Sequence, residues 1–181
     1  MKIVDRWNDV LVLKGERFAD DRGSFEVTSA QDVVEQLVGH PVQFKQLNTV
    51  RTKWLSGRGL HYNVTGLQAK LVTAISGIHF CVAVDVRKGS ETAGLWFGDF
   101  LSLKTSEGFW VPPGFAHGTV CCCAEGILQY QSTTLHDPAN ERSLALDSDV
   151  DVKWPYRVAD MTVKPGDLAI KTLKEFWSTY E

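Results

Sequence analysis

The amino-acid sequence predicts a mainly β fold, a double-sheet jelly roll with short flanking helices. Two observations support this class, and a third concerns the number of domains. Runs rich in β-branched and aromatic residues recur at intervals of about a dozen residues through the middle of the chain, as in β-sandwiches. Gly-, Pro- or Ser-containing turns separate these runs. No internal repeat or Gly/Ser linker divides the 181 residues, so we expect a single domain over residues 1–181.

The strand candidates lie between residues 70 and 135. Each combines residues that favour extended backbone with a turn signal at its end. They are KLVTAISG (70–77), IHFCVAVDVRKGS (78–90), LWFGDFLSLKTSEG (95–108), FWVPPGFAHGTVCCC (109–123) and GILQYQSTTL (126–135).

Two helix candidates flank these strands. Residues 29–38 begin with a serine and end before Gly39, and Val33, Val34 and Leu37 recur at helical spacing. The stretch from Asp167 to Glu181 carries apolar residues at positions that suit a closing amphipathic helix, namely Leu168, Leu173 and Phe176.

Charge and composition exclude some functions. The net charge of −3 and the pI near 5.9 argue against general binding to nucleic acids or anionic membranes. No apolar run approaches the roughly 20 residues of a membrane-spanning helix, and the first residues do not form a secretory signal, so we expect a cytoplasmic protein. The cysteines, at positions 81, 121, 122 and 123, are expected to be small buried strand residues that neither pair with each other nor bind zinc.

Two of the five histidines stand in distinctive surroundings. His40 and His79 suit structural roles, whereas His61 stands in RGLHY and His117 follows a Pro-Gly turn in VPPGFAHG. The spacing Pro112-x-Gly114-x-x-His117 resembles the second motif of the cupin jelly rolls. The first motif of metal-binding cupins offers H-x-H and a carboxylate. Here the segment reads His61-Tyr62-Asn63 without a nearby acid, a poor ligand set, so we expect neither a metal nor another cofactor.

Further motifs resemble one family, the dTDP-4-dehydrorhamnose 3,5-epimerases, which are metal-free cupins. The similarity runs from about Phe18 to about Asp167, and its motifs occur in the family's order and at similar spacing. They are DDRGSF (20–25), Gln46 and Asn48, RGLHY (58–62), QAKL (68–71), VAVDVRKGS (82–90), T-x-G-x-W (92–96), VPPGFAHG (111–118), Tyr130, and the stretch from DPANER to KWP (137–155).

The resemblance implies a role for four catalytic residues. His61 matches the general base and Asp167 the aspartate that orients it. Lys70 matches the lysine that stabilises the enolate oxygen, and Tyr130 matches the acid on the opposite face of the sugar. These residue types suit the reaction, because removing a proton next to a ketone needs a base of near-neutral pKa and stabilisation of an oxyanion. From the residues alone, Asp167 after Pro-Gly could instead be a helix N-cap.

The resemblance also implies a substrate-binding set and a homodimer. The implied contacts to the nucleotide diphosphate or the sugar are Arg22, Phe25, Gln46, Asn48, Arg58, His117 and His136. In the family, the segment matching DDRG reaches into the partner's site. The sequence departs from the family pattern at His136, where a second aromatic is usual, at Val27, in a shorter loop after His61, and in the triple cysteine.

The expected function is therefore inversion of C3, C5 or both in a nucleotide-linked 4-keto-6-deoxy sugar. Two alternatives remain open at this point: a keto-isomerase or C3-only epimerase of a related dTDP- or GDP-linked hexose or heptose, and a non-catalytic cupin that binds nucleotide sugars. The presence of His61, Lys70 and Tyr130 together favours catalysis.

Overall fold

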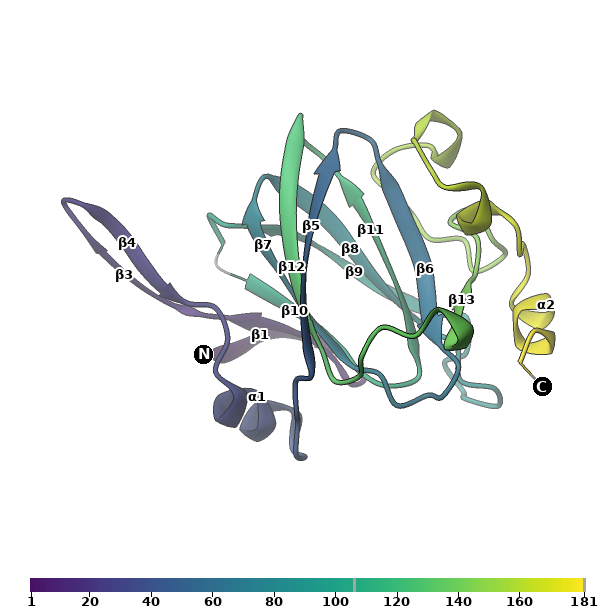
Figure 1. Cartoon of the computed structure of the whole chain (residues 1–181), viewed down its shortest axis with the longest axis horizontal. Helices are drawn as coiled ribbons and strands as arrows, with labels where there is room; N and C mark the ends of the chain where they lie inside the picture. Colours follow the sequence, from purple (N-terminus) through teal and green to yellow (C-terminus); the bar gives the residue numbers. More distant parts are fainter. Residues whose placement is uncertain (106, 181) are drawn as a thin grey trace.

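Two antiparallel sheets packed face to face form the body of the protein in a computed structural model, which describes residues 1–105 and 107–180 (Figure 1). One sheet has the strand order β1-β2-β10-β7-β12-β5, and the other has the order β13-β6-β11-β8-β9. The predicted mainly β jelly roll is confirmed. No helix among the described residues has the length and apolarity needed to cross a bilayer.

The first sheet comprises β1 (Lys2–Trp7), β2 (Val10–Lys14), β10 (Glu107–Val111), β7 (Lys70–Ser76), β12 (Glu125–Ser132) and β5 (Gln46–Lys53). The second comprises β13 (Glu141–Ser143), β6 (Gly57–Asn63), β11 (Phe115–Cys121), β8 (Ile78–Asp85) and β9 (Trp96–Ser102). A separate hairpin of β3 (Glu16–Asp20) and β4 (Gly23–Val27) extends away from both sheets (Figure 1).

The strand runs predicted between residues 70 and 135 contain β7 to β12, although residue 106 lies outside the description. Strands β1 to β6 were not predicted individually. Every residue of β3 is exposed, and β5 is an edge strand whose residues alternate between half-buried and exposed over most of its length. Such strands lack the apolar runs that mark buried β-structure.

The first helix, α1 (Gln31–Val38), begins later than predicted. Ala30 rather than Ser29 occupies the N-cap position, and no side chain caps the helix there. The predicted end is correct, because Gly39 adopts φ 82° and its N–H donates to the Glu35 carbonyl, a conformation that glycine adopts without strain. Val34 is fully buried against the outer face of the first sheet.

The single C-terminal helix predicted from Asp167 to Glu181 is wrong, and Glu181 lies outside the described residues. A 3-10 turn, η3 (Pro165–Leu168), is followed by an extended stretch and then by α2 (Leu173–Ser178). The Ile170 and Lys171 carbonyls accept hydrogen bonds from Ala145 and Asp149. These tertiary contacts hold the backbone extended despite its amphipathic pattern. Two further 3-10 turns are η1 (Pro138–Asn140) and η2 (Val158–Asp160).

The core has three layers. Apolar side chains between the two sheets form the central layer, which includes Val12, Val72, Phe109 and Leu128. Helix α1 covers the outer face of the first sheet, and the C-terminal segment covers the outer face of the second with Leu173 and Phe176. The predicted burial in strands is confirmed for Cys81 and Cys121. It is wrong for Cys122 and Cys123, which lie beyond the end of β11 and are half-buried.

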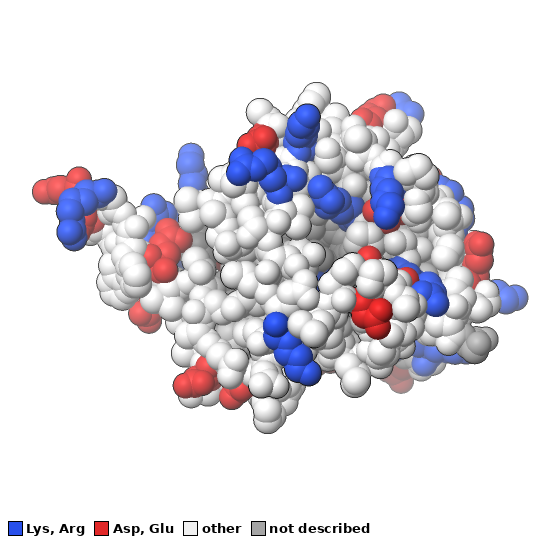
Figure 2. Space-filling view, viewed as in Figure 1, with Lys and Arg blue, Asp and Glu red and all other residues white. Residues whose placement is uncertain are grey.

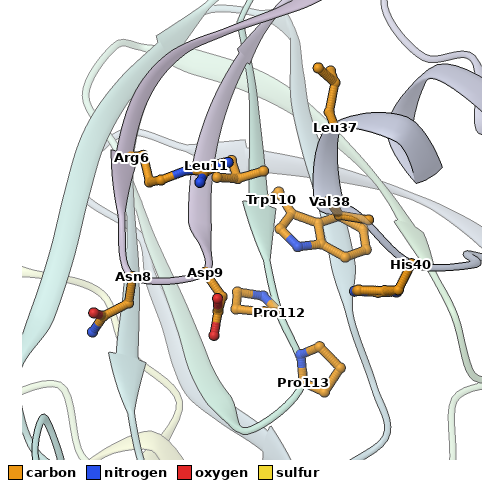
Figure 3. A pocket seen from close by; sticks show the side chains of 10 residues that line it. All are labelled: Arg6, Asn8, Asp9, Leu11, Leu37, Val38, His40, Trp110, Pro112 and Pro113. Atoms are coloured by element: carbon orange, nitrogen blue, oxygen red, sulfur yellow. The ribbon is translucent and has the colours of Figure 1, made fainter.

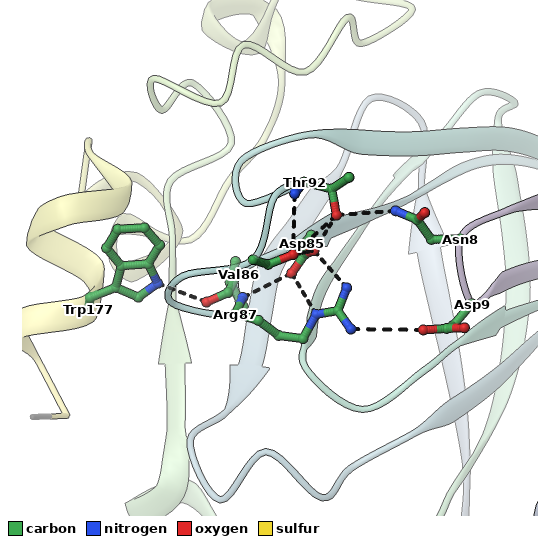
Figure 4. Close-up of polar contacts among 8 residues, drawn as sticks. Asn8, Asp9, Asp85, Val86, Arg87, Thr92 and Trp177 are labelled. Atoms are coloured by element: carbon green, nitrogen blue, oxygen red, sulfur yellow. Dashed lines mark hydrogen bonds and ion pairs between the residues drawn. The ribbon is translucent and has the colours of Figure 1, made fainter.

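The motif VDVRKGS builds a polar cluster around the buried carboxylate of Asp85 (Figure 4). Arg87 donates to this carboxylate from its backbone N–H, Nε and Nη2, and Ser90 and Thr92 donate from their hydroxyls. Asn8 and Asp9 of the β1–β2 turn contact Thr92 and Arg87. Burial alone raises the pKa of Asp85, but these hydrogen bonds lower it to about 2. The motif therefore has a structural role, because its polar cluster connects the β8–β9 loop to the β1–β2 turn. We refer to these contacts around Asp85 as the clasp.

We predict that this clasp makes the protein acid-sensitive in a defined range. Because the folded pKa of Asp85, about 2, lies below its ordinary value of 3.8, the stabilisation is complete above about pH 4 and is lost as the pH falls toward 2. The shift corresponds to roughly 2 kcal/mol. Asp85→Asn should lower the free energy of unfolding near neutral pH by about 2–3 kcal/mol and flatten this acid dependence.

Urea unfolding measured from pH 2 to pH 7 checks this prediction. Asp9→Asn is the matched control, because Asp9 approaches the same Arg87 at 3.8 Å but is mostly exposed; its loss should be far smaller. Equal stability of Asp85→Asn and wild type at pH 7 would contradict the proposed role of Asp85.

Candidate active site

Strand β6 places His61 between two neighbouring strands. His117 of β11 lies directly opposite it on one side and Ser143 of β13 on the other. Directly opposed residues of antiparallel strands point to the same face, so these three side chains project together. The Nε2 atom of His61 lies 2.9 Å from Oδ1 of Asp167. The predicted contact between these two residues is therefore present.

Asp167 is buried and accepts hydrogen bonds from three groups. Besides His61, the Ser143 hydroxyl donates to Oδ1 at 3.0 Å and the Gly59 N–H donates to Oδ2 at 3.2 Å. Burial raises the pKa of Asp167, but the hydrogen bond and charge of His61, followed by the other two donors, lower it overall. Lys164, not Asp167, stands at the N-cap of η3. The N-cap alternative is therefore wrong.

Glycine in RGLHY allows β6 to approach β11 closely. Gly59 has φ +103°, and a Cβ at this position would lie 2.4 Å from the His117 carbonyl oxygen. A larger residue would have to push the two strands apart. The glycine thus permits the spacing that sets His61 beside His117.

Lys70 and Tyr130 come from the opposite sheet. Lys70 begins β7 and Tyr130 lies in the adjacent β12, and the Lys70 ammonium is 5.9 Å from the centre of the Tyr130 ring. Together with His61 and His117 they line a cavity of about 160 Å³ between the sheets. Its other lining residues are Val50, Arg58, Val72, Thr119, Leu128, His136 and Glu141. Figure 2 shows a hollow between the positions of β5 and β6, with positive and negative side chains on its rim.

Burial dominates the electrostatics of this cavity. It lowers the pKa of Lys70, although the charge of Glu141 opposes that change. Burial, Lys70 and His61 together hold the pKa of His117 well below its usual value, so His117 is neutral. The pKa of Tyr130 is raised by burial and by Glu141, and Arg58 partly offsets this. The Nε2 atom of His117 is buried and has no protein hydrogen-bond partner among the described residues.

Three more of the predicted residues form a polar chain beside the cavity. The backbone N–H of His136 donates to Gln46 Oε1 at 2.7 Å, and Gln46 Nε2 donates to Asn48 Oδ1 at the same distance. Asn48 lies opposite Tyr130 on the paired strand. Two predicted residues are not brought to the cavity: Arg22 pairs with Asp20 at the tip of the β3–β4 hairpin, and Phe25 is largely exposed on the same hairpin.

Glu141 and Ser143 are among the residues of this site that sequence reasoning missed. Glu141 lies in DPANER, a motif that carried the resemblance, but nothing in the sequence indicated its charge beside Lys70 and Tyr130. Its carboxylate also lies 3.7 Å from Nδ1 of His136. No feature of the sequence indicated Ser143, because its contact with Asp167 depends on the pairing of β13 with β6.

A second cavity, of about 280 Å³, contains none of the predicted site residues. It lies between the β1–β2 turn, the end of α1 and the start of the Pro112-Pro113 turn, around Trp110 (Figure 3). Among the described residues, no group of three or more His, Cys, Asp or Glu side chains is arranged to hold a metal ion.

Comparison with known proteins identifies a family to which the sequence is similar. A model of the family described as dTDP-4-dehydrorhamnose 3,5-epimerase matches residues 6–175. The dTDP-4-dehydrorhamnose 3,5-epimerase of Pseudomonas aeruginosa is 39% identical over 154 residues, which are 84% of this chain and 85% of that protein. The dTDP-4-dehydrorhamnose 3-epimerase of Streptomyces niveus is 34% identical over 142 residues, 77% of this chain and 69% of that protein.

A solved structure shows the same fold. The dTDP-6-deoxy-D-glucose-3,5-epimerase of Legionella pneumophila, crystallised with dTDP-4-keto-L-rhamnose, superimposes with a TM-score of 0.89 at 34% identity. The match covers 95% of this chain and 92% of that one. The chain therefore belongs to the dTDP-4-dehydrorhamnose 3,5-epimerase family.

Proposed function

We propose that this protein epimerises a dTDP-linked 4-keto-6-deoxy sugar at C3, C5 or both. The observation that carries the proposal is the facing arrangement of the His61–Asp167 pair on one sheet and Lys70 with Tyr130 on the other, across a single cavity. The relatives named as 3,5-epimerases, and the Legionella protein's complex with dTDP-4-keto-L-rhamnose, support the substrate class.

In this proposal His61 removes the proton from the carbon beside the ketone. Asp167 accepts the hydrogen on Nε2, which leaves Nδ1 as the basic nitrogen and stabilises the imidazolium that forms. The carboxylate remains ionised, as its lowered pKa requires.

The negative charge that develops on the ketone oxygen is stabilised by the Lys70 ammonium. In a partly buried cavity, this attraction is stronger than it would be in solution. Because the charge appears only along the reaction path, the interaction lowers the barrier and does not merely tighten binding. The buried, unpartnered Nε2 of neutral His117 supplies a hydrogen bond to a substrate oxygen.

Inversion then requires a proton from the opposite face. Tyr130 comes from the sheet opposite His61, and its raised pKa keeps the phenol protonated and ready to donate. Arg58, at the rim of the cavity, supplies positive charge for the diphosphate, and Gln46, Asn48 and His136 hold the sugar end through their linked hydrogen bonds.

Epimerisation at C3 alone is the second candidate function, and the presence of His136 supports it. Its imidazole stands in the cavity wall where the family pattern has an aromatic, and it pairs with Glu141 rather than presenting a flat apolar face. The Streptomyces niveus relative is named as a 3-epimerase. Whether the enzyme inverts one carbon of the sugar or two thus depends on how the cavity wall near His136 positions C5 of the sugar.

We further propose that two copies assemble so that the β3–β4 hairpin of one completes the cavity of the other, within a cytoplasmic single-domain enzyme. The hairpin extends from the body (Figure 1) and exposes Phe18 and Phe25, whose rings lie 6.3 Å apart. An exposed aromatic pair on a projecting hairpin is costly in a monomer and suits burial against a partner. Arg22 at its tip would then add a cation for the diphosphate.

We predict that His61→Ala abolishes deuterium entry at C3 of the 4-keto sugar. Loss of a general base costs roughly 10²–10⁴-fold in rate. Proton NMR of the sugar ring after incubation in heavy water measures the exchange. His40→Ala is the control, because His40 is exposed and does not line the cavity. Exchange by His61→Ala at the wild-type rate would rule out His61 as the base.

We predict a different outcome for Tyr130→Phe. Exchange needs only the base and Lys70, since the protonated histidine can return a deuteron to the same face. Inversion needs the phenol, whereas the retained ring keeps the packing. This variant should therefore still incorporate deuterium but yield much less inverted sugar, measured by NMR after trapping with a 4-ketoreductase. Fully inverted product at the wild-type rate would place the acid elsewhere, and His136→Phe would be examined next.

We predict that Arg22→Ala and His61→Ala complement each other when co-expressed. A hybrid dimer would hold one cavity with both changes and one with neither, so the mixture should recover about a quarter of wild-type activity. Each variant alone should be much less active. A mixture no more active than the two variants measured separately would contradict the shared site, while leaving the His61 exchange result untouched.

A further inference from the structure

All four cysteines are free, and three of them follow one another at the C-terminal end of β11. Cys81 and Cys121 are fully buried, and Cys122 and Cys123 are half-buried just after β11 ends. Cysteine side chains of adjacent residues in extended backbone point to opposite faces, whereas those two positions apart share a face. The three consecutive residues therefore separate into one pair and one single cysteine.

The pair is Cys121 and Cys123, whose sulfurs lie 3.8 Å apart. Cys122 faces the other way: its thiol is directed to the Val120 carbonyl, and its side chain packs against the apolar layer outside the second sheet. The bend at Cys123 allows its sulfur to turn back toward Cys121. A disulfide needs an S–S distance near 2.05 Å, so closing the bond requires the two sulfurs to approach from their present 3.8 Å.

The surrounding backbone holds both sulfurs in place. Cys121 exchanges hydrogen bonds with Leu55 and Ser56, and the N–H of Cys122 donates to the Ile78 carbonyl. The Ile78 N–H donates to Cys123 Sγ at 3.2 Å. The Cys123 thiol in turn donates to the Glu125 carbonyl at 3.2 Å, and Cys123 is the more accessible member of the pair.

The two thiols are chemically unequal. Burial raises the pKa of Cys121 to about 11, so Cys121 remains a thiol at neutral pH. Cys123 reaches solvent and receives a backbone hydrogen bond at its sulfur. An accessible sulfur with a buried thiol beside it is the arrangement of an oxidisable cysteine and its resolving partner.

We propose that Cys121 and Cys123 form a redox-active dithiol that closes to an intramolecular disulfide under a hydroperoxide. The Cys123 thiolate attacks the peroxide, becomes a sulfenic acid and releases hydroxide or alkoxide. The Cys121 sulfur then displaces the sulfenic oxygen, which leaves as water with the Cys121 proton. Two thiols lose two electrons and the O–O bond is reduced, so the step balances with the hydroperoxide as its only oxidant.

The experiment oxidises the folded full-length protein with hydrogen peroxide, blocks remaining thiols by alkylation and measures intact and peptide masses. The wild type should lose two hydrogens within the peptide that carries residues 121–123, and a dithiol reductant should reverse the change. Cys122→Ser is the matched control and should behave as the wild type, since its sulfur lies on the other face. Cys123→Ser should not form the bridge.

Other products would overturn the proposal. A disulfide that includes Cys81 or Cys122, a link between two chains, or sulfinic acid at Cys123 without a bridge would each show that the pair does not act as a dithiol. Because Cys121 is fully buried, its replacement by serine can prevent folding. The test therefore does not depend on Cys121→Ser. Binding of one phenylarsine oxide per chain by the wild type and by Cys122→Ser, and its loss in Cys123→Ser, provides an independent measurement.

Discussion

The pairing of β6 with β11 and β13 is the constraint on which the rest of the site depends. It aligns His61 with His117 and Ser143, and it requires the backbone at Gly59 to approach the His117 carbonyl too closely for any side chain. The N–H of that same glycine also donates to Asp167, which lies more than a hundred residues later in the sequence. One local backbone arrangement therefore positions His61 and holds Asp167 beside it.

The opposing sheet contributes charge under a different physical constraint. Lys70 and Tyr130 lie in a cavity where burial disfavours their charged forms, and Glu141 is the acid whose field acts on both. Burying the Lys70 ammonium costs free energy, and apolar packing alone does not compensate for that cost. A neutral His117 next to Lys70 avoids a second buried cation. This combination favours a ligand that brings negative charge to Lys70, as an enolate does.

Sequence reasoning succeeded where the signal was local. The runs that contain β7 to β12 carry β-branched periodicity, and the end of α1 follows from Gly39. It failed where tertiary contacts decide the conformation, as in the C-terminal stretch held extended by Ala145 and Asp149. The roles of His61, Lys70 and Tyr130 came from motif resemblance, because no periodicity identifies a base. Ser143 could not be found, since its place beside Asp167 exists only once β13 pairs with β6.

The interior between the sheets divides along β11 into two chemically distinct ends. His117 faces the cavity with Lys70, while Cys121, two inward-facing positions further along the same strand, is opposed by the fully buried His79 of β8. Between them lies the apolar layer that includes Phe109 and Leu128. Burial lowers the pKa of His79, and neither of its ring nitrogens has a hydrogen-bond partner among the described residues. The backbone hydrogen bonds of Cys121 with Leu55 and Ser56 therefore join the C-terminal end of β11 to the segment that leads into β6, the strand that carries His61.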